Sequence, residues 1–70
     1  MPIKVLILPS RRLLELQADS ITLGELVRKL VDMGVGDRIL VLVNDKLAED
    51  QGALIRPGDN VIVVEEAPGG

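Results

Sequence analysis

A single helical repeat, set between short runs of β-branched residues, limits the possible folds of this 70-residue chain more than any other feature. Apolar side chains recur there at i, i+3, i+4, i+7 and i+8, the spacing of one helix face. They are Leu23, Leu26, Val27, Leu30 and Val31. Thr22 and Glu25 have the spacing of a capping box, which predicts the start of the helix, and Gly34 predicts its end. One helix covers one face of a sheet, so the pattern predicts an α+β fold.

The apolar segments outside this helix are too short for a second one and predict β-strands. The expected strands span residues 2–8, 11–17, 38–43 and 61–64. A short strand is expected within residues 47–53, after which Leu54 and Ile55 return to the core. Turns are expected at residues 9–10, 44–46 and 56–59. A hairpin followed by a helical crossover makes the first and last strands adjacent and parallel, in a mixed sheet of four or five strands.

Several of these strands are apolar on both alternating faces, although one helix can bury only one face. The residues expected to face the helix are Ile3, Val5, Ile7, Val61 and Val63. Those expected on the opposite face are Leu6, Leu8, Ile62 and Val64. An apolar surface left uncovered there predicts a docking face for a partner. The alternative is that loops or self-association cover these residues.

The composition excludes most kinds of catalysis. The chain has no Cys, no His and no aromatic residue, which removes the thiol nucleophile, the usual general base and the commonest zinc ligands. Its acidic residues lack the spacing of a calcium loop, so we expect no catalytic residues and no metal site. The net charge of −3 and the lack of stacking side chains argue against nucleic acid. No apolar run approaches the length of a membrane span, and we expect no membrane partner and a cytoplasmic location.

The last four residues, Ala67-Pro68-Gly69-Gly70, differ in kind from the rest of the chain. Proline cannot continue a hydrogen-bonded ladder, and glycine has no Cβ to exclude it from a narrow slot. We therefore expect a folded domain over residues 1–66 and a flexible diglycine tail over residues 67–70, ending in an accessible carboxylate at Gly70. The alternative is a frayed end without a function.

At this point the chain resembles the β-grasp sulfur carriers and ubiquitin-like proteins, a group that includes ThiS, the small subunit of molybdopterin synthase, and small archaeal and bacterial modifiers. The likeness covers nearly the whole length in element order. It rests on residues 22–26 opening the helix, 43–45 closing a strand, 54–61 entering the last strand, and Gly69-Gly70. The family usually has Gly where this chain has Asp45, and the first hairpin departs from the molybdopterin synthase pattern.

The resemblance implies that an activating enzyme of the ThiF or MoeB type adenylates Gly70, with ATP held by that enzyme and no cofactor on the carrier. A sulfur donor then converts the adenylate into a thiocarboxylate, which passes sulfur to an acceptor enzyme in cofactor or tRNA biosynthesis. Gly69 would fit the slot of the activating enzyme. The docking face would comprise Leu6, Leu8, Ile62 and Val64, together with Pro68.

Three interpretations follow for the sequence. The chain is a sulfur carrier, or a modifier conjugated through Gly70 to lysines of target proteins, or a β-grasp interaction domain whose diglycine has no chemical role. The first two share the adenylation step. Thiamine synthesis, molybdenum cofactor synthesis, tRNA thiolation and protein modification all stay open as the pathway.

Overall fold

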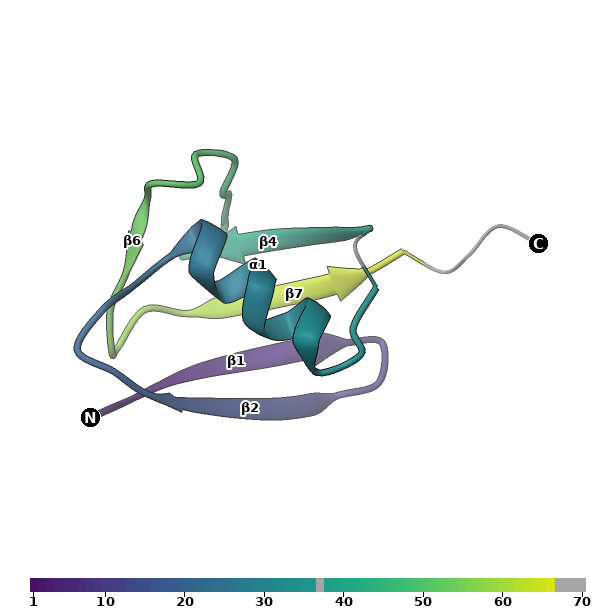
Figure 1. Ribbon diagram of the computed structural model, residues 1–70, viewed down its shortest axis with the longest axis horizontal. Coiled ribbons are helices and arrows are strands. Elements are labelled where there is room, and N and C mark those ends of the chain that lie inside the picture. The colour runs from purple at the N-terminus through teal and green to yellow at the C-terminus, as the bar shows by residue number, and fades with distance from the viewer. Residues whose placement is uncertain (37, 67–70) are drawn as a thin grey trace.

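The computed structural model describes residues 1–36 and 38–66, in which a five-stranded mixed sheet is crossed on one face by one helix (Figure 1). The strands lie in the order β2-β1-β7-β4-β5. Their bounds are β1 Pro2–Leu8, β2 Arg12–Gln17, β4 Ile39–Val43, β5 Lys46–Leu47 and β7 Val61–Glu65. The helix α1 spans Leu23–Asp32, and no helix among the described residues is long and apolar enough to cross a membrane. The predicted α+β architecture is confirmed.

The central pair of the sheet joins the two ends of the described chain. β1 and β7 run parallel, with Val5 beside Val61 and Leu8 beside Val64, and β2 pairs antiparallel with β1. A parallel pair needs a crossover, and α1 supplies part of it on the way from β2 to β4. The predicted adjacency of the first and last strands is confirmed.

The core is aliphatic and lies between the sheet and α1. Every strand residue predicted to face the helix is buried, and α1 adds Leu23, Leu26 and Leu30, which are at most 4% exposed. The buried residues of the five-stranded sheet are Ile3, Val5, Ile7, Val41, Val61 and Val63. Among the described residues no charged or polar side chain is buried with them, so burial of Leu, Ile and Val provides the main stabilisation.

The predicted ends of α1 are confirmed. The Glu25 amide donates to Thr22 Oγ1 at 3.1 Å and the Thr22 amide donates to Glu25 Oε1 at 3.2 Å, so the capping box is complete. At the other end Gly34 has a φ of 94°, and the Val35 amide donates back to the Leu30 carbonyl at 2.9 Å. These are the positive φ and the back-bond of a glycine-terminated helix.

The prediction that Val31 faces the core is wrong, because its side chain is 45% exposed. With about 100° between successive residues, a residue eight positions after Leu23 has rotated about 80° away from it. Leu30 occupies the inward direction in that turn and is fully buried. The inward stripe is therefore narrower than the repeat suggested.

The segment after β4 also differs from the prediction. The short strand begins earlier, at Lys46, and Leu54 is 54% exposed instead of packing in the core. A small second sheet explains Leu54: β3 (Ile21–Thr22) pairs antiparallel with β6 (Leu54–Ile55). In a two-residue strand alternate side chains point to opposite faces, so burial of Ile55 turns Leu54 to solvent.

Two turns at one end of the sheet are tied together by a polar network. Asn44 and Asp45 have φ values of 53° and 69°, the left-handed pair of a type I′ hairpin turn. The Asn44 amide side chain donates to Asp59 Oδ1 at 3.1 Å and accepts from the Asn60 amide at 2.9 Å. The second carboxylate oxygen of Asp59 accepts from the Arg56 amide at 2.8 Å. Asn44 thus links the β4–β5 turn to the turn that precedes β7.

The helix packing predicts a contrast between two neighbouring residues. Leu30→Ala removes a fully buried side chain and should lower the free energy of unfolding by about 2–5 kcal/mol, because it leaves a cavity in a small core. Val31→Ala should change it by less than about 0.5 kcal/mol, because that side chain faces water. Urea unfolding followed by circular dichroism measures both. Equal losses would contradict the packing described here.

The polar network predicts a pH dependence of stability. Hydrogen bonds from the Arg56 amide and then from the Asn44 side chain lower the pKa of Asp59. A carboxylate whose pKa is lowered by folding stabilises the protein at pH values above its unfolded pKa of about 4. This contribution is lost as the pH falls through the pKa of the folded state. In Asp59→Asn the free energy of unfolding should therefore fall less steeply between about pH 5 and pH 2 than in the wild type. Asn44→Ala should show part of this change, and a wild-type slope in Asp59→Asn would contradict the assignment.

Candidate functional site

The face of the sheet opposite α1 carries the apolar residues predicted there. Leu6 and Leu8 of β1 lie beside Ile62 and Val64 of β7 in the parallel register. All four are half-buried, whereas their neighbours in the chain that face the helix are buried. The structure thus brings together these predicted residues on one continuous surface. Their function as a docking face stays a prediction.

Strand pairing extends this surface across the whole sheet in two rows. The first row has one residue from each strand and crosses the sheet from β2 to β5. Its members, in order, are Leu13, Leu6, Ile62, Leu42 and Leu47. In the second row Val64 lies between Leu8 and Leu40. We call these two rows the apolar island. It comprises Leu6, Leu8, Leu13, Leu40, Leu42, Leu47, Ile62 and Val64.

The most exposed members of the island are residues that sequence reasoning missed. Leu13, Leu40 and Leu47 are 61%, 44% and 48% exposed. Their positions follow from the register: Leu13 alternates with Leu14, and Leu40 alternates with the buried Val41. The alternation was visible in the sequence, but the pairing that aligns them with Leu6 and Val64 was not.

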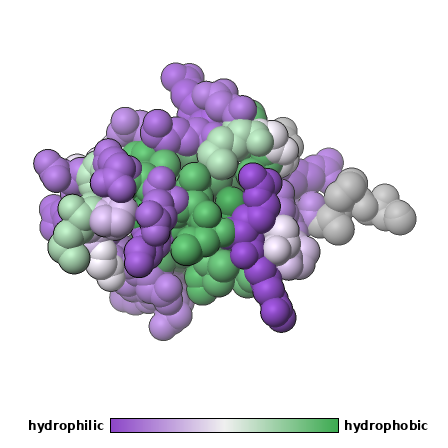
Figure 2. All heavy atoms as spheres, turned by 90° about the horizontal axis from the view of Figure 1, so that it is seen from below, coloured by the Kyte–Doolittle hydropathy of each residue, from purple (hydrophilic) through white to green (hydrophobic). Residues whose placement is uncertain are grey.

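Charged and polar residues border the island along the strands. On one side Lys4 lies opposite Glu15, in the next outward row of the β1–β2 pair. On the other side the Glu66 amide donates to the Arg38 carbonyl at 3.0 Å, which extends the β4–β7 pairing to two exposed residues. Figure 2 shows the β2 edge of the molecule, from below the view of Figure 1, where hydrophobic atoms lie in the middle and hydrophilic atoms lie around and partly across them. An apolar centre with a polar rim is the usual anatomy of an interface.

The island lies close in sequence to the predicted reactive residues. Val64 is two residues before Glu66, the last described residue of this end, and the Arg38 carbonyl fixes the Glu66 amide. Gly69, Gly70 and Pro68 lie outside the described residues. The row of Leu8, Val64 and Leu40 is therefore the part of the island nearest to the point where the chain continues toward them.

The described residues offer little for catalysis by the chain itself. They contain no group of three or more potential metal-ligating side chains. Glu65 lies opposite Ile39, on the helix side of the sheet, and Glu66 follows it with the opposite parity, so the two carboxylates cannot flank one bond. Hydrogen bonds from Thr22 lower the pKa of Glu25, but these bonds belong to the helix cap.

The comparison with protein families agrees with this geometry. A family model described as "ThiS family" matches residues 7–70, which is more than half of the chain and includes every strand and the helix except the first residues of β1. No curated protein gives a significant match.

The exposure of the island predicts a second contrast between neighbours. Leu40→Asp should lower the free energy of unfolding by less than about 1 kcal/mol, because its side chain already faces water. Val41→Asp should lower it by more than about 3 kcal/mol, because a carboxylate would be buried without a partner. Thermal and urea unfolding of both variants measure the difference. A severe loss in Leu40→Asp would mean that the island is packed against another part of the protein.

Proposed function

The chain belongs to the ThiS family, whose members are sulfur carriers and not enzymes, and on that premise we propose that the Gly70 carboxylate is the group that carries sulfur. The mixed sheet with its one described helix is the β-grasp fold of that family. The observation that supports the proposal most is the apolar island, whose second row is centred on Val64 in β7, the strand after which the chain continues to Gly69 and Gly70. A carrier needs such a docking surface near its reactive end.

The length of the terminal segment limits where the chemistry takes place. Four residues follow Glu66, and a fully extended segment of that length spans at most about 14 Å. The Arg38–Glu66 hydrogen bond gives this segment a fixed origin at the edge of the island. The reacting carbonyl carbon would therefore lie within about 14 Å of the docked sheet, inside the activating enzyme.

Activation is needed because a carboxylate is a poor acceptor for nucleophiles. A Gly70 carboxylate oxygen attacks the α-phosphorus of ATP, which forms an acyl adenylate and releases pyrophosphate. A sulfur donor at the oxidation level of sulfide then attacks the carbonyl carbon, the bond to the AMP oxygen breaks, and AMP leaves with the bonding electron pair. The product is a thiocarboxylate at Gly70. The carrier contributes the acyl group and its position, and ATP binds on the partner.

We propose a ThiF-type activating enzyme as that partner, as family membership implies. Its docking surface would be apolar to match the island, and its slot would be too narrow for a side chain at Gly69. The island's row of Leu8, Val64 and Leu40 would lie nearest to the slot, with Pro68 entering it. The acceptor of the sulfur is a second enzyme that binds the same end of the carrier.

The proposal predicts which variants lose activation. Deletion of Gly70 should abolish ATP–pyrophosphate exchange with a ThiF-type enzyme, and Gly69→Val should lower it strongly by blocking the slot. Val64→Asp should also lower exchange, since it places a charge in the island. Val31→Asp is the matched control: it makes the same change at an exposed position on the helix side and should leave exchange unchanged. Circular dichroism confirms that each variant is folded.

Intact mass spectrometry identifies the product. With ATP, activating enzyme and sulfide, the carrier should gain the mass difference between sulfur and oxygen. Full exchange by the Gly70 deletion would refute the proposal and favour an interaction domain. Covalent ladders on lysines of other proteins, without the sulfur product, would favour a protein modifier instead.

A further inference from the structure

One edge of the sheet has backbone groups available for pairing. The Glu66 amide bonds the Arg38 carbonyl and the Asn44 amide bonds the Asn60 carbonyl, so the even-numbered residues of β4 bond to β7. In an antiparallel pair the residues that alternate with the bonded ones direct their amides and carbonyls away from the partner strand, so the odd-numbered residues of β4 direct theirs toward β5. Val43 there pairs with Lys46, and the Val41 carbonyl accepts from the Ala48 amide at 2.8 Å. β5 ends at Leu47 and does not extend as far as Ile39. The amide and carbonyl of Ile39 that point away from β7 therefore have no β5 residue beside them.

A pocket lies alongside this open edge. After Ala48 the chain leaves the sheet and passes to the start of α1, where the carbonyls of Gln51 and Ala53 accept from Gly24 and Leu23 at 3.0 and 2.9 Å. The space between this loop, α1 and β4 is a pocket of about 340 Å³. It is lined by Leu23, Val27, Ile39, Leu40, Val41, Leu47, Ala48 and Glu49.

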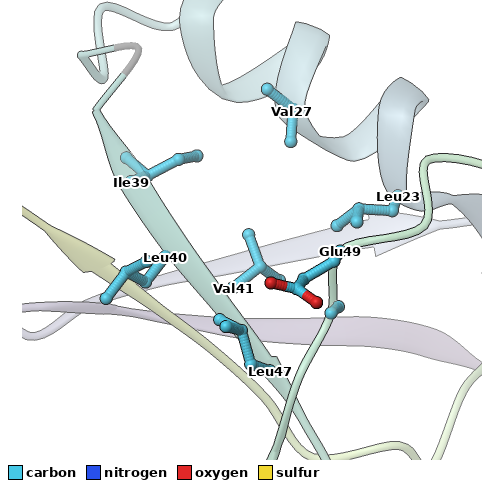
Figure 3. Close-up of a pocket in the computed structure, with 8 residues that line it drawn as sticks. Leu23, Val27, Ile39, Leu40, Val41, Leu47 and Glu49 are labelled. Atoms are coloured by element: carbon cyan, nitrogen blue, oxygen red, sulfur yellow. The ribbon is translucent and has the colours of Figure 1, made fainter.

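The pocket combines apolar walls with one carboxylate. Val27 of α1 and Ile39 of β4 lie across it from each other, and the Glu49 side chain extends from the loop toward Val41 (Figure 3). Among the described residues that line the pocket, Glu49 is the only charged one, and it is exposed. A side chain with an apolar stem and a cationic head matches this arrangement, because lysine and arginine lay their methylene groups on apolar surface and keep the charge at the tip.

We propose that this edge binds an extended segment of a partner protein that presents a lysine or arginine opposite Ile39. The segment adds a strand to β4 through the amide and carbonyl of Ile39, in line with β5. Its residue opposite Ile39 lies on the helix side of the sheet, as Ile39 does, so its side chain enters the pocket and its cationic head meets the Glu49 carboxylate. The residues before and after it lie on the other face, one beside Leu40, where an apolar side chain fits the island, and one beside the exposed Arg38. The site does not depend on Gly70.

A segment of a partner protein fits this edge and its carboxylate better than a lysine of a second copy does, because of where the lysines lie in the fold. Lys4 lies in β1, which is paired on both sides, and Lys29 lies in the helix. Lys46 lies in the two-residue β5. Arg12 begins the edge strand β2, but pairing β2 of one copy with β4 of the next is a heterologous contact that leads to open-ended assembly.

Titration of the 15N-labelled full chain with short capped peptides tests the proposal. The probe has the sequence Thr-Val-Lys-Val-Thr, which reads the same in both directions, and its controls carry norleucine or glutamate in place of lysine. We expect saturable shifts centred on Ile39, Val27 and Glu49, slower exchange of the Ile39 amide, and binding of the norleucine peptide that is about tenfold weaker. Equal binding of the three peptides, or shifts centred on Leu6 and Ile62, would overturn the proposal.

A charge exchange gives the sharper test. The Glu49→Lys variant should no longer bind the lysine peptide and should bind the glutamate peptide instead. The Glu49→Gln variant should bind the lysine and norleucine peptides equally. Glu49 is exposed, so these variants should keep the wild-type stability. Absence of the exchange in preference would refute the role of Glu49. Concentration-dependent assembly in sedimentation, abolished by Arg12→Glu, would assign the edge to a second copy instead.

Discussion

The parallel pairing of β1 with β7 is the interaction on which the rest of the structure depends. It places Val5 beside Val61 and Leu6 beside Ile62, and so forms both surfaces of the sheet at once. The residues facing α1 are buried as the core, while the alternate residues form the centre of the apolar island. The same pairing fixes the direction of β7, and therefore the end of the sheet from which the chain continues past Glu66. The core, the apolar island and the point where the chain leaves the sheet are three consequences of one register.

Much of this arrangement could be predicted because it rests on local periodicity. The capping box, Gly34 and the alternation in β1 and β7 are short-range signals, and the structure confirms each of them. The error at Val31 was local, because the apolar repeat extends beyond the inward stripe of the helix, but the error at Leu54 arose where non-local pairing decides. Leu54 faces solvent because β6 pairs with β3, about thirty residues away in the chain. Likewise, Leu13 and Leu40 join the island through registers that no local pattern contains.

The absence of aromatic residues links the core to the proposed docking. A core of Leu, Ile and Val is stabilised by many similar contacts, and the island is made of the same residue types. Interfaces that bind tightly usually concentrate their affinity in Trp, Tyr or Arg anchors. The island has none of these among its members, so the affinity of the proposed docking would be spread over small contributions. The island is bordered by the charged residues Lys4, Glu15, Arg38 and Glu66. In the proposed docking these charges would orient the partner more than they would raise the affinity.

Weak docking suits a carrier that visits more than one enzyme. A carrier must leave the activating enzyme before it can deliver sulfur, so its dissociation rate limits the transfer as much as its affinity does. Affinity differences between related complexes arise mostly in the dissociation rate. In the proposed function the reaction takes place on the partner, and the carrier's own residues would determine its position and residence time there. The open edge at Ile39 lies beside Leu40 of the island, so a strand bound there would extend the contact without adding an aromatic anchor.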